Sequence, residues 1–369
     1  MITTTEIAFI CFVLLILFSF WKTKKATKEL PTLDYKSGEQ LKGIAIILVV
    51  FGHLCSGFIN LPDLKYSGAQ GVTIFLILSG YGLTKSYLNK GIDGTFFVRR
   101  FKTVLFPYML VTGVVILLDY FTHKNTIPKS IILSSMFGIN TQVDPTMWYI
   151  SFILLWYVAF YVVFGLSVNN TIKIALLLVF SFIIKYTAPS GSTLLNAPYE
   201  YSLHAFAFPI GVMGALYSKN VLASLKTKRN QISVLAAVAI LLLVGFVLTY
   251  RDISIEHQTI YTIINLMLSV SLIIFITLLS YLRIESKLLV LLGAYSYEIY
   301  LFEALFFTRY DVLHKFSNKW VSLFLYIFMI LLFSFVLNTF VKLIWGQYNK
   351  IKERRNLKIK QYGDNAIKR

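Results

Sequence analysis

The residue best placed for chemistry is His53, which lies in a stretch, residues 43–58, that is otherwise apolar enough to sit in lipid. An ionisable side chain at membrane depth is costly and usually faces the protein interior, so it marks a functional site by default. Lys42 stands eleven residues earlier. At about 1.5 Å per residue, His53 lies roughly 16 Å deeper than Lys42, near the middle of a hydrocarbon core of about 30 Å. The spacing predicts chemistry inside a bilayer; the alternative is a neutral histidine bonded between helices.

A second candidate group is basic. The segment Phe96-Phe97-Val98-Arg99-Arg100-Phe101-Lys102 precedes Pro107, where the chain enters an apolar run. Arg99, Arg100 and Lys102 beside aromatic rings have the charge and geometry to hold the phosphates of a nucleotide-like ligand. The alternative interpretation is a topology signal, since basic residues are common next to membrane helices.

Acidic residues on a late helix are candidate partners for His53. Counted from Lys287, Glu298 is eleven residues along a straight helix, which predicts the same depth of about 16 Å as His53, and Glu303 lies about 24 Å in, nearer the opposite face. Glu298 is therefore expected to orient His53, the alternative being bonds to tyrosine hydroxyls or water.

Glu200 and His204 are interpreted as a local i to i+4 pair near the interface, and Trp148 and Tyr149 as interfacial anchors. The spacing of histidines and cysteines predicts no metal site.

The elements that position these residues are membrane helices. Hydrophobic residues make up 57% of the 369 residues and charged residues 14%, which excludes a soluble domain. The two cysteines, Cys11 and Cys55, indicate neither a disulfide framework nor a metal site. Apolar runs predict an all-α polytopic protein with about eleven transmembrane helices, at residues 6–21, 41–58, 68–88, 103–121, 147–166, 172–186, 201–217, 232–250, 259–282, 288–307 and 320–345.

The basic residues predict the orientation of these helices. With residues 22–42 taken as cytoplasmic, 27 of the 35 Lys and Arg fall on the cytoplasmic side, which leaves 8 outside. This bias predicts an N-terminus outside and a C-terminus in the cytoplasm. The net charge of +18 is then positive-inside bias, and the tail after residue 346 is expected to meet an anionic leaflet rather than nucleic acid.

Five segments in a fixed order resemble the membrane-bound acyltransferase family 3 of largely bacterial O-acyltransferases. They are Lys42 followed by His53; Gly71-Val72 through Ser79-Gly80-Tyr81; the basic segment with Pro107; Met147-Trp148-Tyr149-Ile150-Ser151; and Leu292-Gly293-Ala294-Tyr295-Ser296-Tyr297-Glu298-Ile299-Tyr300-Leu301. The sequence departs from the family pattern at Lys42, where arginine is usual, at Lys102, the second basic position of an arginine-x-x-arginine pattern, and at Glu303, where histidine is frequent.

The resemblance implies a bacterial inner-membrane enzyme that transfers an acyl group, most simply acetyl from acetyl-CoA, to a hydroxyl of a cell-surface glycan or its lipid-linked precursor. It implies Lys42, Arg99, Arg100 and Lys102 as donor-binding residues, Trp148, Tyr149 and Glu303 on the acceptor side, and no tightly bound cofactor. His53 would act as general base or accept the acyl group itself.

The predicted divisions of the chain are an extra helix and linker at 1–38, the acyltransferase-like domain at 39–346 and a basic tail at 347–369. The alternative function is a proton-coupled transporter in which His53 and Glu298 relay protons.

Overall fold

The computed structural model describes residues 22–23, 33, 35–59, 67–122, 128–141, 143–187, 199–218, 234, 237, 258–281 and 284–367. They form two compact units, residues 1–300 and 301–369. The first unit contains helices α2 (Tyr35–Gly57), α3 (Ser67–Lys90), α4 (Phe96–Arg100), α5 (Phe106–Thr122), α6 (Lys129–Met136), α7 (Trp148–Gly165), α8 (Asn170–Thr187), α9 (Tyr199–His204), α10 (Ala207–Leu216), α13 (Gln258–Tyr281) and α14 (Lys287–Ala294). It also contains the π-helix η2 (Phe101–Leu105), the 3₁₀ helix η3 (Pro145–Met147) and the paired two-residue strands β1 (Lys22–Thr23) and β2 (Ile284–Glu285).

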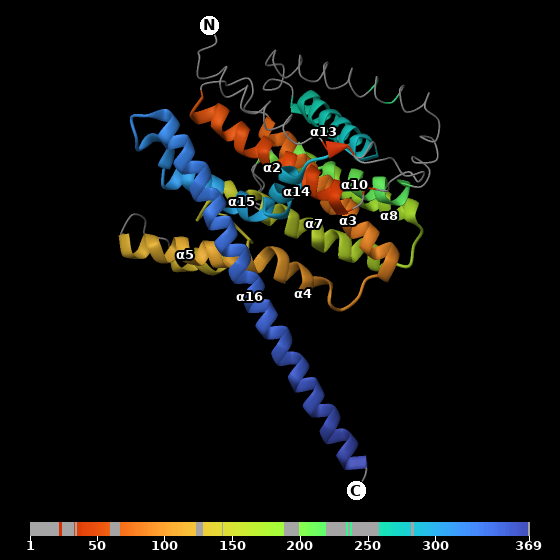
Figure 1. Ribbon diagram of the computed structural model, residues 1–369. Helices are drawn as coiled ribbons and strands as arrows, with labels where there is room; N and C mark the ends of the chain where they lie inside the picture. The colour runs from red at the N-terminus through yellow and green to blue at the C-terminus, as the bar shows by residue number, and fades with distance from the viewer. Residues whose placement is uncertain are drawn as a thin grey trace. The chain divides into compact units, whose positions relative to one another are not determined.

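The centre of the first unit is the packing of α2 against α3 and α14 and of α3 against α10 (Figure 1). Gly43 of α2 and Gly293 of α14 each face the other helix so closely that an added Cβ would collide with a backbone carbonyl, of Leu289 and Glu39 respectively. Small residues let membrane helices approach to this distance, where dispersion and weak polar contacts replace the hydrophobic effect. Leu41, Ile44, Ala45, Ile74 and Leu289 form the buried core between the three helices.

The second unit begins within α15 (Ser296–Ala304) and contains the π-helix η5 (Leu305–Arg309), the 3₁₀ helix η6 (Val312–His314) and α16 (Lys319–Ile367). Helix α16 is unbroken over 49 residues, so the predicted tail from residue 347 continues this helix (Figure 1). Phe302 and Phe306 pack their rings against Phe333 of α16. The Tyr326 hydroxyl donates a hydrogen bond of 3.2 Å to the Glu303 carbonyl oxygen.

Large apolar side chains remain exposed along several helices, as they do on a surface that faces lipid. Examples are Leu117 and Phe121 of α5, Val162 of α7 and Phe324 of α16, each more than half exposed. A soluble monomer rarely exposes contiguous apolar surface of this kind. These helices therefore support the predicted membrane protein.

The predicted set of about eleven spans is confirmed only in part. In the described part of the chain, five helical segments are long and apolar enough to cross a membrane: Tyr35–Gly57, Phe96–Thr122, Pro145–Gly165, Asn170–Thr187 and Lys319–Ile351. A sixth candidate is bent by 66° between Lys287–Ala294 and Ser296–Arg309. Two predicted spans, at 6–21 and 232–250, lie outside the described residues apart from two isolated positions in the latter.

The three other predicted spans form helices of a different character. Helix α3 carries buried polar residues such as Thr73 and Thr84, and α13 carries Thr262 and Asn265. The segment 201–217 is divided into α9 and α10. A helix surrounded by protein does not need an apolar face toward lipid, because its polar groups bond to neighbouring helices. Uniform hydrophobicity is therefore a weak signal for these interior helices.

Two lysines near the ends of the predicted span 172–186, which the orientation count places on opposite sides of the membrane, are buried in the protein. The Lys173 ammonium donates to the Tyr87 hydroxyl at 2.9 Å and lies over the Tyr87 and Phe164 rings. The Lys185 ammonium donates to the Thr262 hydroxyl at 2.9 Å. Because one lysine came from each predicted side of the membrane, the bias that predicts the orientation is not altered.

Candidate functional site

His53 lines a cavity of about 390 Å³ in the first unit. Ligand pockets commonly span about 300–1,000 Å³, so the space suits a small ligand or part of a larger one. Apolar walls come from α2, α3 and α9, including Val49, one helical turn before His53. The residues that can make polar contacts in the cavity are His53, Thr146, Trp148, Glu200, His204 and Tyr300. Five separate segments therefore converge on the histidine that the sequence singles out.

Helix α2 presents His53 to this cavity. The helix begins at Tyr35, two turns before Lys42, so Lys42 lies within the helix rather than at its start. The Lys42 ammonium forms an ion pair of 2.9 Å with the buried Glu39 carboxylate, one turn away on α2. The eleven-residue separation of Lys42 and His53 is continuous helix, so the predicted rise of roughly 16 Å between them holds.

The wall formed by η3 and α7 is held to α15 by tyrosine. The Tyr300 hydroxyl donates a hydrogen bond of 2.9 Å to the Thr146 carbonyl oxygen. Tyr149 packs edge-to-face on Tyr300, with ring centroids 5.6 Å apart. The Tyr297 hydroxyl donates to the Val104 carbonyl oxygen at 2.6 Å. The serine-tyrosine segment of the sequence thus fixes the position of α15 in the first unit and contributes Tyr300 to the cavity.

The expected meeting of Glu298 with His53 rested on a straight helix, and that premise is wrong. Helix α14 ends at Ala294 and α15 begins at Ser296, with a bend of 66°. Counting residues from Lys287 therefore does not give depth beyond the bend. Among the described residues that line the His53 cavity, α15 contributes Tyr300 and not Glu298, which is buried. Glu303 is also fully buried and belongs to the second unit.

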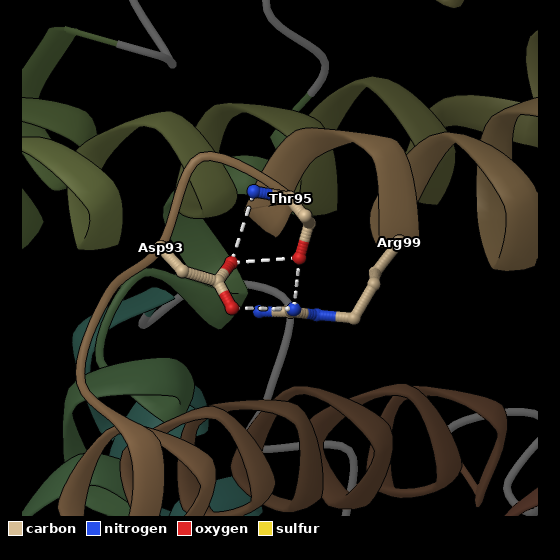
Figure 2. A network of polar contacts seen from close by, with 3 residues as sticks. All are labelled: Asp93, Thr95 and Arg99. Atoms are coloured by element: carbon tan, nitrogen blue, oxygen red, sulfur yellow. Dashed lines mark hydrogen bonds and ion pairs between the residues drawn. The ribbon is translucent and has the colours of Figure 1, made fainter. Parts of the chain in front are cut away.

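The two arginines of the basic segment have different surroundings. Arg99 is 38% exposed and donates to the Asp93 carboxylate at 2.9 Å and to the Thr95 hydroxyl. Asp93 also accepts hydrogen bonds from the Thr95 backbone N–H at 3.0 Å and the Thr95 hydroxyl at 2.8 Å (Figure 2). The Arg99 guanidinium and the Thr95 bonds lower the pKa of Asp93 to about 2, so the carboxylate stays ionised at neutral pH.

Arg100 lies against aromatic rings. Its guanidinium carbon is 5.8 Å from the centre of the Phe96 ring and 5.6 Å from that of Tyr157, distances typical of cation–π contact. Arg99 and Arg100 line a cavity of about 10 Å³ between α3 and α4, the space of about one water molecule. Lys102 follows in η2 and is half-buried. Among the described residues, the basic residues are thus adjacent, and the cavity that the two arginines line has room for about one water molecule.

Sequence reasoning missed the contribution of α9. Glu200 and His204 both line the His53 cavity. The interpretation as a local pair near the interface does not describe His204, which is 1% exposed and bonds through Nδ1 to Thr73 of α3 at 2.8 Å. The available signal was the polar character of Tyr199–His204, where an acid, a serine and a histidine interrupt the apolar runs.

The geometry defines a helical membrane protein with a histidine-containing polar cavity. Residues 36–349 match the acyltransferase domain of acyltransferase family 3. This match covers most of the 369 residues, so the chain belongs to that family, as the five sequence segments predict. It is a multi-pass membrane acyltransferase. Comparison with curated proteins and with solved structures gives no match.

Proposed function

We propose that the protein transfers an acyl group, most simply acetyl, from cytoplasmic acyl-CoA to a hydroxyl of a cell-surface glycan or its lipid-linked precursor in the bacterial inner membrane. The observation that carries the proposal is that His53 lines a polar cavity of about 390 Å³ in a member of an acyltransferase family. A neutral imidazole is the side chain best suited to accept a proton near neutral pH.

The reaction needs a base and a route for one proton. His53 takes the proton of the acceptor hydroxyl while its oxygen attacks the thioester carbonyl carbon. The carbon–sulfur bond then breaks, and the CoA thiolate leaves and takes the proton from the imidazolium. In the covalent alternative, the His53 nitrogen attacks the thioester and the CoA thiolate leaves; the acceptor hydroxyl then takes the acyl group from the imidazole, and its proton goes to the thiolate. Both routes give the same products, CoA and an acyl ester.

The basic segment is the proposed site for the CoA phosphates. Guanidinium groups match phosphate oxygens in charge and planar geometry. Asp93 now occupies the position on Arg99 that a phosphate would take, since both are anions bonded to the same guanidinium. Donor binding therefore replaces this ion pair and opens the small cavity beside Arg100. Lys42 and Lys102 are the further proposed donor-binding residues.

The acceptor is proposed to enter the His53 cavity. Trp148 lines it directly, and Tyr149 packs edge-to-face on Tyr300, which also lines it. Aromatic faces beside a carboxylate, here Glu200, suit a sugar, which presents both C–H faces and hydroxyl donors. Glu303, which belongs to the second unit, is also a proposed acceptor-side residue.

The orientation that this proposal needs is testable by cysteine labelling. Positions 89 and 139 are exposed and fall on predicted cytoplasmic and outer sides respectively. In a background without Cys11 and Cys55, an impermeant thiol reagent added to intact cells should label Ile139→Cys and not Asn89→Cys. The reverse result would place the basic segment away from cytoplasmic CoA.

The function itself is tested by mass spectrometry of surface glycans from cells with and without the protein, paired with CoA release from acetyl-CoA by the purified protein. Acyl esters that depend on the protein, together with CoA release, are the expected result. Glycan transport without CoA release would instead support the proton-coupled transporter.

A further inference from the structure

His204 is held by contacts from two other helices, and one of the contacting residues is itself bonded to a third helix. Its Nδ1 lies 2.8 Å from the Thr73 hydroxyl of α3. Asn265 of α13 donates its side-chain N–H to the same hydroxyl at 2.7 Å. Trp148 of α7 stacks on the imidazole, with ring centroids 5.4 Å apart and an angle of 18°. His204, Thr73 and Asn265 are each at most 1% exposed.

This chain of hydrogen bonds is compatible with the imidazole tautomer that carries its proton at Nε2. The Asn265 amide supplies a hydrogen to the Thr73 oxygen, so the hydroxyl's own hydrogen is available for a second partner. His204 Nδ1 lies within reach of that hydrogen, at 2.8 Å, and acts as acceptor in the tautomer protonated at Nε2. An imidazole that accepts at Nδ1 carries its proton at Nε2. In this tautomer His204 is a neutral N–H donor among the residues that line the His53 cavity.

The two histidines of the cavity have surroundings that suit different tasks. His53 lies on α2 and is half-buried, which leaves room for a proton to arrive and leave. His204 is buried and stacks against Trp148. It is positioned by Thr73, which is bonded in turn to Asn265. Fixed donors in a site of low polarity stabilise developing negative charge well, because they need no reorganisation when the charge forms.

We propose that the His204 Nε2–H donates a hydrogen bond to the acyl carbonyl oxygen as negative charge develops on it, with Thr73 and Asn265 as positioning residues. This inference rests on the proposed function. When the acceptor oxygen, or His53 itself, attacks the carbonyl carbon, the π-electron pair moves to the carbonyl oxygen. The pair returns as the carbon–sulfur bond breaks and the thiolate leaves. The donor role is thus the same in the direct and the covalent route.

The experiment uses the full-length protein in lipid nanodiscs with acetyl-CoA and extracted surface glycans. Glutamine places an N–H near the position of histidine Nε2, whereas leucine fills the space without a donor. We expect His204→Leu to lower kcat by roughly 100- to 1,000-fold. We expect His204→Gln to keep at least about a tenth of kcat, with the KM for acetyl-CoA little changed in both variants.

Variants of the positioning residues provide a second measurement. Thr73→Val removes the hydroxyl at similar volume and should lower kcat, whereas Thr73→Ser should restore it. The acid limb of the pH–kcat profile should stay in place in His204→Gln, because His53 and not His204 acts as the base. His314→Gln is the matched control, since His314 is an exposed histidine paired with Asp311.

The outcomes separate this inference from the proposed function. If His53→Ala abolishes CoA release while His204→Leu and Thr73→Val keep wild-type kcat, the donor role is wrong and the acyltransferase function stands. A shifted acid limb, or no rescue by His204→Gln in a protein of normal thermal stability, would also overturn the donor role. If the wild-type protein releases no CoA and acylates no glycan, the proposed function fails, and this inference fails with it.

Discussion

The His53 cavity and the basic segment around Arg99 differ in how completely each is assembled. The cavity has a volume of about 390 Å³, and the residues that line it come from five segments of the chain. The space beside Arg99 and Arg100 is about 10 Å³, with Arg99 paired to Asp93 and Arg100 on aromatic rings. The comparison indicates that the proposed site of chemistry is formed in advance, whereas the proposed phosphate site must exchange partners to bind its ligand.

The largest effect is expected at the preassembled cavity. His53→Ala should lower acyl transfer by about 100- to 10,000-fold, the usual contribution of a general base, or more if the covalent route operates. The fold should persist, because the substitution removes a modest interhelical contact. The measurement is glycan acylation and CoA release, with membrane insertion checked on the same sample. Normal acylation by inserted His53→Ala would contradict the mechanism.

Glu298→Gln tests whether the Glu298 carboxylate takes part in the chemistry at His53. If the carboxylate orients His53, as the sequence predicts, transfer should fall nearly as far as in His53→Ala while KM for acetyl-CoA changes little. This is the most informative variant of α15, because the bend at Tyr295 removes the straight-helix argument that placed Glu298 at the depth of His53. Tyr300→Phe is the comparison variant on the same helix, since it removes the hydroxyl that bonds to the Thr146 carbonyl. Full activity of Glu298→Gln would confine Glu298 to packing.

At the basic segment, a smaller effect on donor binding is expected. Removing a charge-assisted hydrogen bond costs about 1.5–3 kcal/mol, so Arg100→Ala should weaken acetyl-CoA binding by roughly 10- to 100-fold. Arg99→Ala should cost less, because Arg99 gives up its pair with Asp93 on binding. Lysine at either position should restore charge and only part of the affinity. Titration calorimetry at two salt concentrations measures the affinity of each variant for acetyl-CoA. Unchanged affinity in both alanine variants would contradict the assignment of the basic segment as the donor site.

The smallest effect is expected from Asp93. Asp93→Asn removes the anion that competes for Arg99, so affinity for acetyl-CoA should rise by a few-fold at pH 7. The pKa of Asp93, lowered to about 2, lies below its ordinary value of about 3.9. Its stabilising contact is thus complete above pH 4 and is lost as pH falls toward 2. The affinity gain of Asp93→Asn should therefore be the same at pH 5 and pH 8. An affinity gain at only one of these two pH values would indicate that a titratable group other than Asp93 contributes.

The sequence by itself determined the class of protein, because hydrophobicity and charge bias are properties of composition and local order. It also determined the family, through five short segments, and it singled out His53 as a candidate, since a histidine in an apolar helix is visible without a structure. The rise from Lys42 to His53 followed from helix geometry alone. Such inferences succeed wherever the relevant contacts are local in sequence.

Only the tertiary structure decided which residues join His53. Thr73 and His204 are 131 positions apart and meet because α3 and α9 pack together. Glu298 was expected at the cavity and Tyr300 lines it, because the helix bends at Tyr295 instead of continuing straight. Arg99 and Arg100 are neighbours in sequence, yet one meets Asp93 and the other meets Tyr157 on α7. Hydrophobic patterning specifies that helices form and pack, but their neighbours and bends depend on side-chain contacts between distant segments.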